Sequence, residues 1–255
     1  PDKRVSGKGI KILKDAGIEV HLGLCQKESL ELNRSFIYKN KNDRAYGVLK
    51  TAMSIDGRIG LKNGKSKWIT NKYSRSLVHS FRSEYDAIII GGNTLRKDDP
   101  FLTSRGLKET EPLRVVFTRS LDLPKKCNLW DCEKAKTLVI YDSTSANEKF
   151  LERIPKSVEV EKVSSDNPRL ISKLLAKRGC NKILWECGPN LATAAVKSRC
   201  IQEIVTFIAP KILGGESNMT PFGDFEFLEM SEVFYLKNPH FNLIGDDICV
   251  KSSLD

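Results

Sequence analysis

Short apolar runs rich in β-branched residues alternate with longer amphipathic stretches along most of the chain, which predicts alternating strands and helices. Three helices are predicted, each opening with a residue suited to a helix start: Asn71–Arg82, Pro168–Lys177 and Pro189–Arg199. The expected strands are Gly47–Ser54, Asp86–Gly92, Leu113–Thr118, Lys136–Asp142, Val158–Val163, Lys182–Cys187 and Ile204–Pro210. Ile88–Ile90 is apolar on both faces, as in a strand covered by helices on each side. The pattern predicts an α/β fold with a mostly parallel, doubly wound sheet and helices on both faces.

The first 36 residues have a different pattern. GKGIKILKDAGIEVHLGL predicts a helix that runs to Ala16, a stop at Gly17 and a short strand from Ile18 to Leu22. We therefore expect a segment at 1–36 that is too short to hold its own core, a polar linker at 37–46 and a main domain at 47–255. Because the chain begins with Pro1 rather than methionine, we expect it to be a fragment of a longer protein.

The composition of the 255 residues is that of a globular protein, with 40% hydrophobic and 29% charged residues. Lys and Arg total 42 against 32 Asp and Glu, and the resulting charge of +10 favours anionic partners such as phosphates, nucleotides or nucleic acid. No apolar run approaches the length of a membrane span, so we expect a cytoplasmic protein. Seven scattered cysteines without a C-x-x-C pair, and three histidines, predict reduced thiols and no metal site.

The stretch from Leu49 to Arg105 combines several features that are individually ordinary. An Asp-Gly turn, a Ser-x-Trp loop and a Gly-Gly-Asn-Thr turn each follow or join predicted strands, where α/β sheets bind their ligands. Arg82 and Arg105 add positive charge suited to a phosphate. Lys65 and Lys67 fit a phosphate site and a solvated basic face equally well.

A second informative stretch is ILWECGPNLATAAV, residues 183–196. A strand ends at Glu186, and Gly188-Pro189 opens a helix whose free N-terminal amides are able to bind anionic oxygen. The stretch lacks the G-x-G-x-x-G pattern and an acidic residue at the matching distance, which disfavours a Rossmann dinucleotide fold.

These motifs occur in a specific order: LKxAMSxDGR, G-x-S-x-WIT, RxxxDAIIxGxNTxxxDDPxLTxR, RVV, WECGPxLA and APKxLGG. From about residue 47 onward the chain thereby resembles the reductase domain of the bifunctional riboflavin-biosynthesis deaminase/reductase family, whose fold is dihydrofolate-reductase-like. A plausible terminal strand lies around residues 245–249. Residues 1–36 resemble the tail of that family's deaminase domain, but His-x-Glu and Pro-Cys-x-x-Cys, which hold the deaminase zinc, are absent from the sequence. We therefore expect no deaminase activity.

The resemblance implies NADPH-dependent reduction of the ribosyl C1′ of 5-amino-6-(5-phosphoribosylamino)uracil, by a homodimer. The implied cofactor contacts are Ala52, Trp68, Thr94, Asp98, Gly188, Pro189, Asn190, Leu191, Ala192, Thr193 and Ala194. The implied substrate contacts are Ser66, Arg82, Leu102, Arg105 and Glu186. Among these, the two arginines would grip the 5′-phosphate and Glu186 the aminouracil. Lys50, Asp56 and Glu186 form the expected catalytic set, the first two for orientation or proton handling.

Thr118-Arg119 departs from the family pattern, and Arg119 would pair with the 2′-phosphate of NADPH if it faces the cofactor. Two other functions remain open on the residues alone. A pterin or folate reductase of the same fold would have little use for two arginines around a phosphate. A nucleic-acid-binding module would fit the charge, but the aromatic residues, 8% of the chain, do not cluster with the basic ones. An inactive dimer scaffold is disfavoured by the intact motifs.

Overall fold

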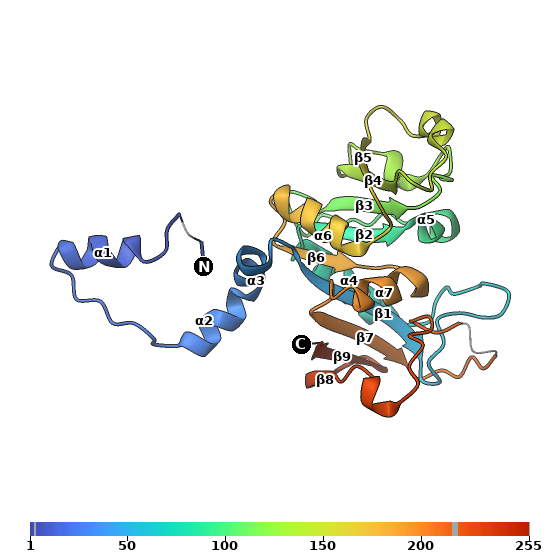
Figure 1. Cartoon of the computed structure of the whole chain (residues 1–255). Helices are drawn as coiled ribbons and strands as arrows, with labels where there is room; N and C mark the ends of the chain where they lie inside the picture. The colour runs from blue at the N-terminus through green and yellow to red at the C-terminus, as the bar shows by residue number, and fades with distance from the viewer. Residues whose placement is uncertain (3, 216–218, 255) are drawn as a thin grey trace.

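The sheet of this protein is parallel except at one edge. The computed structural model describes residues 1–2, 4–215 and 219–254 (Figure 1). Within them, the nine strands pair in the order β5-β4-β3-β2-β6-β1-β7-β9-β8, and only the pairs β7–β9 and β8–β9 are antiparallel. The strands are β1 (Tyr46–Ser54), β2 (Ala87–Gly91), β3 (Leu113–Thr118), β4 (Thr137–Asp142), β5 (Glu159–Val163), β6 (Lys182–Trp185), β7 (Glu203–Ala209), β8 (Lys237–Ile244) and β9 (Asp247–Ser253).

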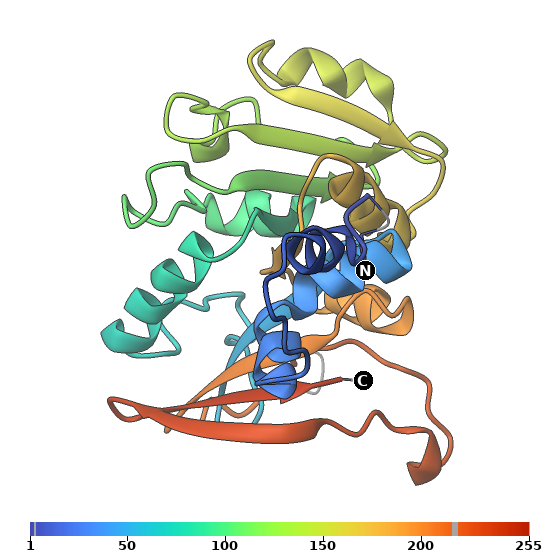
Figure 2. The same cartoon turned by 90° about the vertical axis from the view of Figure 1, so that its left-hand side faces the viewer.

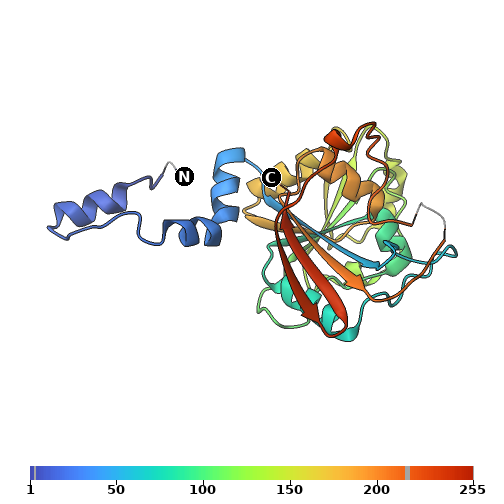
Figure 3. The ribbon, with the colours of Figure 1, turned by 90° about the horizontal axis from the view of Figure 1, so that it is seen from below.

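Helices cover both faces of the sheet, as Figure 3 shows from below. The α-helices are α1 (Lys8–Asp15), α2 (Gln26–Leu32), α3 (Arg34–Asn42), α4 (Lys72–Ser83), α5 (Gly92–Asp98), α6 (Pro168–Lys177) and α7 (Pro189–Lys197). One apolar core lies beneath α4 and α5, which contribute Val78 and Leu95. A second core lies beneath α6 and α7, with Leu175 and Ala195 among its members. The mostly parallel sheet between two helical layers confirms the predicted fold class.

The seven predicted strands correspond to β1–β7, and the three predicted helices to α4, α6 and α7. The predicted strand at Ile18–Leu22 is wrong: both end residues are more than half exposed and no neighbouring strand pairs with them. A strand without a partner in a sheet leaves its backbone groups without ladder hydrogen bonds, so the segment stays irregular.

The expected linker at 37–46 is mostly helical, because α3 packs against the sheet. The ring of Tyr38 lies edge-on to that of Tyr46, with centroids 5.6 Å apart, and its hydroxyl accepts a 2.8 Å hydrogen bond from the amide of Gln202. By contrast, α1 and α2 bury no residue and project from the body of the molecule (Figures 1 and 2). The division into remnant, linker and main domain stays a prediction.

The end of the chain forms a hairpin rather than a single strand. β8 precedes the predicted terminal strand, a turn follows at Gly245-Asp246, and the predicted strand itself extends to Ser253 as β9. β8 carries Pro239, which is tolerated there because β8 is the outer strand of the sheet.

Candidate functional site

The strand register brings two of the expected catalytic residues together. β1 and β6 pair in parallel with Leu49 opposite Trp185, so the next residues, Lys50 and Glu186, lie beside each other on the same face. β6 lies between β1 and β2, at the point where the chain returns to the middle of the sheet. Such reversals of strand order are where open α/β sheets bind ligands, beyond the carboxyl ends of the strands.

Arg82 of α4 closes this position from above with a two-pronged ion pair. Its Nε donates to Glu186 Oε1 at 2.7 Å and its Nη2 to Oε2 at 3.0 Å. Burial raises the pKa of Glu186, but the charge and hydrogen bonds of Arg82 outweigh it, and the pKa stays below its usual range. The Nη1 group faces the backbone carbonyl of Thr103 and Nδ1 of His79, each at 3.3 Å. Four of the five N–H donors of this guanidinium are therefore engaged within the protein.

Lys50 joins Arg82 in a cationic cluster around Glu186, and His79 lies beside Arg82. Burial lowers the pKa of Lys50, although the charge of Glu186 opposes the shift. Burial, followed by the charges of Arg82 and Arg105, also lowers the pKa of His79, which favours the neutral imidazole. The sequence-based prediction did not include His79; its position one helical turn before Arg82 was the available signal.

The loop between α5 and β3 carries two further expected substrate residues, Leu102 and Arg105. Leu102 is buried and Arg105 is exposed, and both have left-handed backbone conformations, with φ of 53° and 59°. The carbonyl of Thr103, between them in sequence, accepts a hydrogen bond from Arg82, so the loop approaches the cluster. The backbone of this loop is held by Glu111, which accepts hydrogen bonds from Ser104 and Gly106. Sequence reasoning did not identify Glu111.

Helix α4, which presents His79 and Arg82, is fixed to the terminal hairpin at its first turn. Asn71 caps the helix by accepting from the backbone N–H groups of Tyr73 and Ser74, each at 2.9 Å. The buried carboxylate of Asp247 accepts from the Asn71 N–H at 2.8 Å and from the Ser74 hydroxyl at 2.6 Å. The hairpin, which lies far along the chain, thereby sets the position of the cluster.

Asp56, the third expected catalytic residue, organises the turn after β1. Its carboxylate accepts from the Ser54 hydroxyl and from the N–H groups of Leu213 and Gly214, at 3.1 and 2.7 Å. The hydrogen bond from Ser54, which is the largest cause, and those from the backbone lower the pKa of Asp56 to about 2. An acid this strong is ionised at neutral pH, and its contacts favour orientation over proton transfer.

The predicted Ser-x-Trp loop lies beyond β1 and contacts the end of α5. Trp68 is 63% exposed and its ring lies 4.4 Å from the guanidinium carbon of Arg75. Lys211 holds this loop by donating to the Trp68 and Ile69 carbonyls at 2.9 and 2.7 Å. Lys67 reaches the Asp98 carbonyl at 3.5 Å, so the loop that carries Ser66 and Trp68 approaches Asp98. Ala52 lies two residues after Lys50, on the same face of β1.

A cavity of about 800 Å³ lies beside the cluster, at the carboxyl ends of β2, β3 and β4. Six expected cofactor residues line it: Thr94, Gly188, Pro189, Asn190, Leu191 and Ala194. At Gly188 an added Cβ would meet no atom closer than Thr94 Oγ1, at 3.9 Å, so the backbone there is open to a ligand. No side chain caps the N-terminus of α7, which leaves its first amides available for anionic oxygen. The cavity is therefore suited to a nucleotide.

Two members of the expected cofactor run do not line this cavity. Ala192 is fully buried in the core beneath α7. Thr193 is buried too, and its hydroxyl accepts a 2.8 Å hydrogen bond from the N–H of Gly223. Thr193 lies one helical turn after Pro189 and Asn190, on the same side of α7, and the cofactor roles of Ala192 and Thr193 stay predictions.

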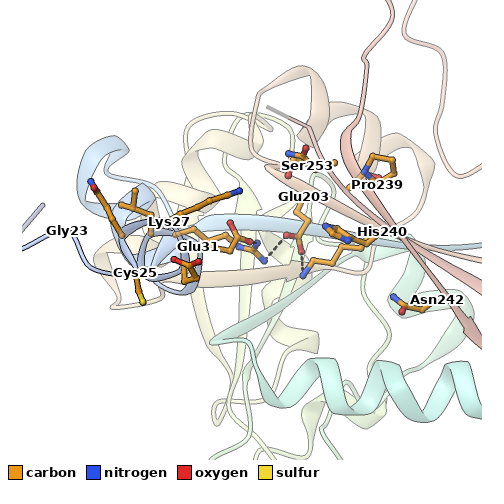
Figure 4. Close-up of a pocket in the computed structure, with 16 residues that line it drawn as sticks. Gly23, Cys25, Lys27, Glu31, Glu203, Pro239, His240, Asn242 and Ser253 are labelled. Carbon is orange, nitrogen blue, oxygen red and sulfur yellow. Dashed lines mark hydrogen bonds and ion pairs between the residues drawn. The ribbon is translucent and has the colours of Figure 1, made fainter.

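A larger cavity lies elsewhere, between α2 and the terminal hairpin, and has a volume of about 1360 Å³ (Figure 4). It is lined by Glu203, which pairs with Arg34 at 2.7 Å and Lys251 at 3.3 Å. None of the predicted site residues lines it. The expected cofactor residues line the smaller cavity instead, so size alone does not identify the site.

The described residues contain neither a candidate metal site nor a candidate membrane span. No group of three or more His, Cys, Asp or Glu side chains is arranged to hold a metal ion. No helix in that part of the chain has the length and apolarity to cross a membrane.

Fold and site together define an α/β protein with a nucleotide-sized cavity beside a cationic cluster. The model of the RibD C-terminal domain matches residues 45–250, and the chain belongs to this family. The match begins at residue 45, next to the start of β1 at Tyr46.

The similar proteins are longer than this chain, which matches only part of each. The chain is 40% identical to the riboflavin biosynthesis protein RibD of Synechocystis, and the match covers 97% of this chain and 67% of that protein. It is 37% identical to the chloroplastic riboflavin biosynthesis protein PYRR of Arabidopsis thaliana, of which it spans 44%. Among solved structures, RibD of Acinetobacter baumannii has a TM-score of 0.85 at 29% identity, covering 100% of this chain and 70% of that one. A deaminase/5-amino-6-(5-phosphoribosylamino)uracil reductase of Thermotoga maritima has a TM-score of 0.81 at 27% identity, covering 100% of this chain and 69% of its own.

Proposed function

We propose that this chain reduces the ribosyl C1′ of 5-amino-6-(5-phosphoribosylamino)uracil with a hydride from NADPH, as a step of riboflavin biosynthesis. The observation that carries the proposal is the cationic cluster around Glu186, two residues before the Gly188 that lines the nucleotide-sized cavity. It offers cations to a phosphate and a carboxylate to an aminouracil within reach of a bound nicotinamide. Membership of the RibD C-terminal domain family supports the same reaction.

The substrate roles follow from which donors remain free. Since Arg82 directs most of its N–H groups at Glu186, Thr103 and His79, we assign the 5′-phosphate chiefly to the exposed Arg105. Arg82 then holds Glu186 ionised and in place for the N–H groups of the aminouracil. Ser66 and Leu102 keep their predicted role as further substrate contacts.

The reaction requires protons as well as a hydride. Opening the ribosyl ring breaks the C1′–O4′ bond, places a proton on O4′ and leaves an imine between C1′ and nitrogen. When the hydride adds to C1′, the electron pair of the C=N bond moves to nitrogen, which takes a proton. Lys50 is our candidate for handling that proton, because it lies beside Glu186 at the carboxyl end of β6 and burial lowers its pKa. Asp56 holds the turn beside it.

The cofactor preference is proposed to be NADPH over NADH. Bound cofactor would supply the hydride, and Thr94 with the exposed members of the run Gly188–Ala194 would hold it in the cavity. Arg119 lines the same cavity, 3.8 Å from Asp166, and both side chains are more than half exposed. A cation at this point is suited to the 2′-phosphate that distinguishes NADPH. Trp68, Ala52 and Asp98 keep their predicted cofactor roles at the loop end of the site.

A homodimer is proposed from the outer part of the sheet. Phe241 and Leu243 of the edge strand β8 are 67% and 76% exposed, and they stand beside Val250 and Ile248 of β9. This apolar strip would be buried by the same strip of a second copy. Light scattering should give the mass of two chains, and Leu243→Asp should give one. The cytoplasm is kept as the proposed compartment.

The segment at 1–36 is proposed to be the end of a deaminase domain, because the apolar side chains of α1 and α2 lack a core to cover them. Neither zinc motif is present, so this chain is proposed to lack deaminase activity.

The test is the loss of reduced-nicotinamide absorbance when the purified chain meets freshly deaminated pathway intermediate. We expect turnover with the phosphoribosylaminouracil and none with dihydrofolate, and faster turnover with NADPH than NADH. Arg105→Ala should raise the KM for the phosphorylated substrate by about tenfold or more and leave the KM for NADPH unchanged. Turnover of dihydrofolate alone would favour the pterin or folate reductase, and tight RNA retention without NADPH affinity would favour the nucleic-acid-binding module.

A further inference from the structure

The loop that carries Leu102 and Arg105 has an unusual backbone. Asp99, Leu102 and Arg105 have φ of 40°, 53° and 59°, and Gly106 follows at 80°. A left-handed conformation at a residue with a side chain is strained and persists where the surroundings hold it. Three such residues within seven positions indicate that specific contacts hold this part of the loop.

Glu111 supplies contacts on both sides of Arg105. Its Oε2 accepts from the Ser104 N–H at 2.6 Å, and its Oε1 accepts from the Ser104 hydroxyl at 2.9 Å and the Gly106 N–H at 3.2 Å. One carboxylate thus binds the backbone immediately before and after the arginine. A carboxylate suits the position because both of its oxygens accept, whereas an amide would turn an N–H toward one of these donors.

Glu111 is itself fixed by the sheet. It precedes β3 by two residues, and β3 begins with a 3.0 Å hydrogen bond from the Leu113 N–H to the Asp86 carbonyl. The buried Arg114 of the same strand reaches back to the Phe101 carbonyl at 3.3 Å. The start and the end of the loop are therefore both tied to β3, and its middle to Arg82 through the Thr103 carbonyl.

We propose that Glu111 is a positioning residue for the substrate phosphate, which holds the loop in its left-handed form and thereby aims Arg105 at the site. The inference rests on the proposed function, since it takes Arg105 as the phosphate ligand. Glu111 makes no contact with substrate in this account and acts through the loop. The sequence motif that ends at Arg105 does not include Glu111, which lies six residues further along the chain.

The experiment is a double-mutant cycle between Glu111→Gln and Arg105→Ala, read in steady-state kinetics and in NADPH binding by fluorescence. Glu111→Gln should raise the KM for the phosphoribosylaminouracil by about tenfold, because the three hydrogen bonds from Ser104 and Gly106 lose their charged acceptor. It should leave kcat within about twofold and the Kd for NADPH unchanged. In the Arg105→Ala background, the same substitution should change KM by less than about twofold.

Glu109→Gln is the matched control, since it removes the same charge from an exposed residue of the same loop and should change neither constant. If Glu111→Gln does not fold, Glu111→Asp keeps the charge but shortens the reach, and a KM increase of about three- to fivefold is expected. An unchanged KM in a folded Glu111 variant, or equal effects with and without Arg105, would overturn the inference. If Arg105→Ala itself leaves the substrate KM unchanged, the phosphate assignment of the proposed function fails instead.

Discussion

The substitution Glu186→Gln tests how much the ion pair between Glu186 and Arg82 contributes to the stability of the folded protein. Both side chains are nearly buried, 10% and 12% exposed, and are joined by two hydrogen bonds. Removing one partner of a buried ion pair costs about 3–5 kcal/mol. Because glutamine keeps the shape and one acceptor, we expect the free energy of unfolding to fall by about 2–4 kcal/mol. At about 2–4 °C per kcal/mol for a protein of this size, Tm should fall by about 4–16 °C.

The pH dependence gives this prediction its sign. The pKa of Glu186 is lowered in the folded protein, so its contribution is complete above the unfolded pKa and is lost as the pH falls through the folded value. The stability gap between the wild type and Glu186→Gln should therefore be largest near pH 7 and shrink below about pH 4.

Thermal and denaturant unfolding, followed by circular dichroism across this pH range, measure the gap. Arg82→Met combined with Glu186→Gln should cost less than the sum of the two single substitutions. Glu84→Gln is the control: its partner Lys182 lies 3.9 Å away at the surface, so it should cost less than about 0.5 kcal/mol. Additive effects in the cycle, or a gap that persists unchanged at low pH, would refute the reasoning.

Three further predictions concern residues around the cluster. Lys50→Met should lower kcat by about 100-fold or more without changing the Kd for NADPH. In the wild type, the rate should fall as the pH rises, and at a lower pH than for a lysine with an ordinary pKa. A kcat of Lys50→Met within threefold of wild type would exclude proton handling by Lys50. Asp247→Ala should lower the free energy of unfolding by about 2–3 kcal/mol in denaturant titrations, because the Asn71 N–H and the Ser74 hydroxyl lose their acceptor. Asp246→Ala, which changes the exposed neighbouring residue, should have little effect. Arg119→Ala should weaken binding of 2′,5′-ADP by about tenfold and leave AMP unchanged in calorimetry; equal losses for both would remove Arg119 from the 2′-phosphate site.

Much of the sheet could be predicted because its strands are buried on both faces. Runs such as Ile88–Ile90 have few alternatives to a covered strand, and the proline starts of α6 and α7 mark helices clearly. β8 could not be predicted in the same way, since its residues are exposed and include Pro239. The Ile18–Leu22 error has the opposite cause: the local pattern favours a strand, but a strand needs a partner and the described chain offers none there.

The site was predictable where a motif marks the residue and not where geometry alone places it. Lys50 lies within β1 and Glu186 directly follows β6, and these two strands are neighbours because of the strand order rather than because of either motif. The ion pair between Arg82 and Glu186 changes the expected division of labour, because a side chain already bound to a carboxylate has few donors left for a phosphate. Asp247 binds Asn71 and Ser74, which are distant in sequence, and Glu111 binds the backbone of its own loop outside the motif, so no motif identifies either residue.

The central claim is that a nicotinamide in the cavity beside Gly188 delivers a hydride to a sugar carbon held near Glu186. The most direct test is to run the reaction with NADPH carrying deuterium at the transferable position and to locate the label in the product by mass spectrometry and NMR. Our account predicts one deuterium, on C1′ of the ribityl chain. Consumption of labelled cofactor without deuterium at C1′, or a label on the pyrimidine ring, would contradict it.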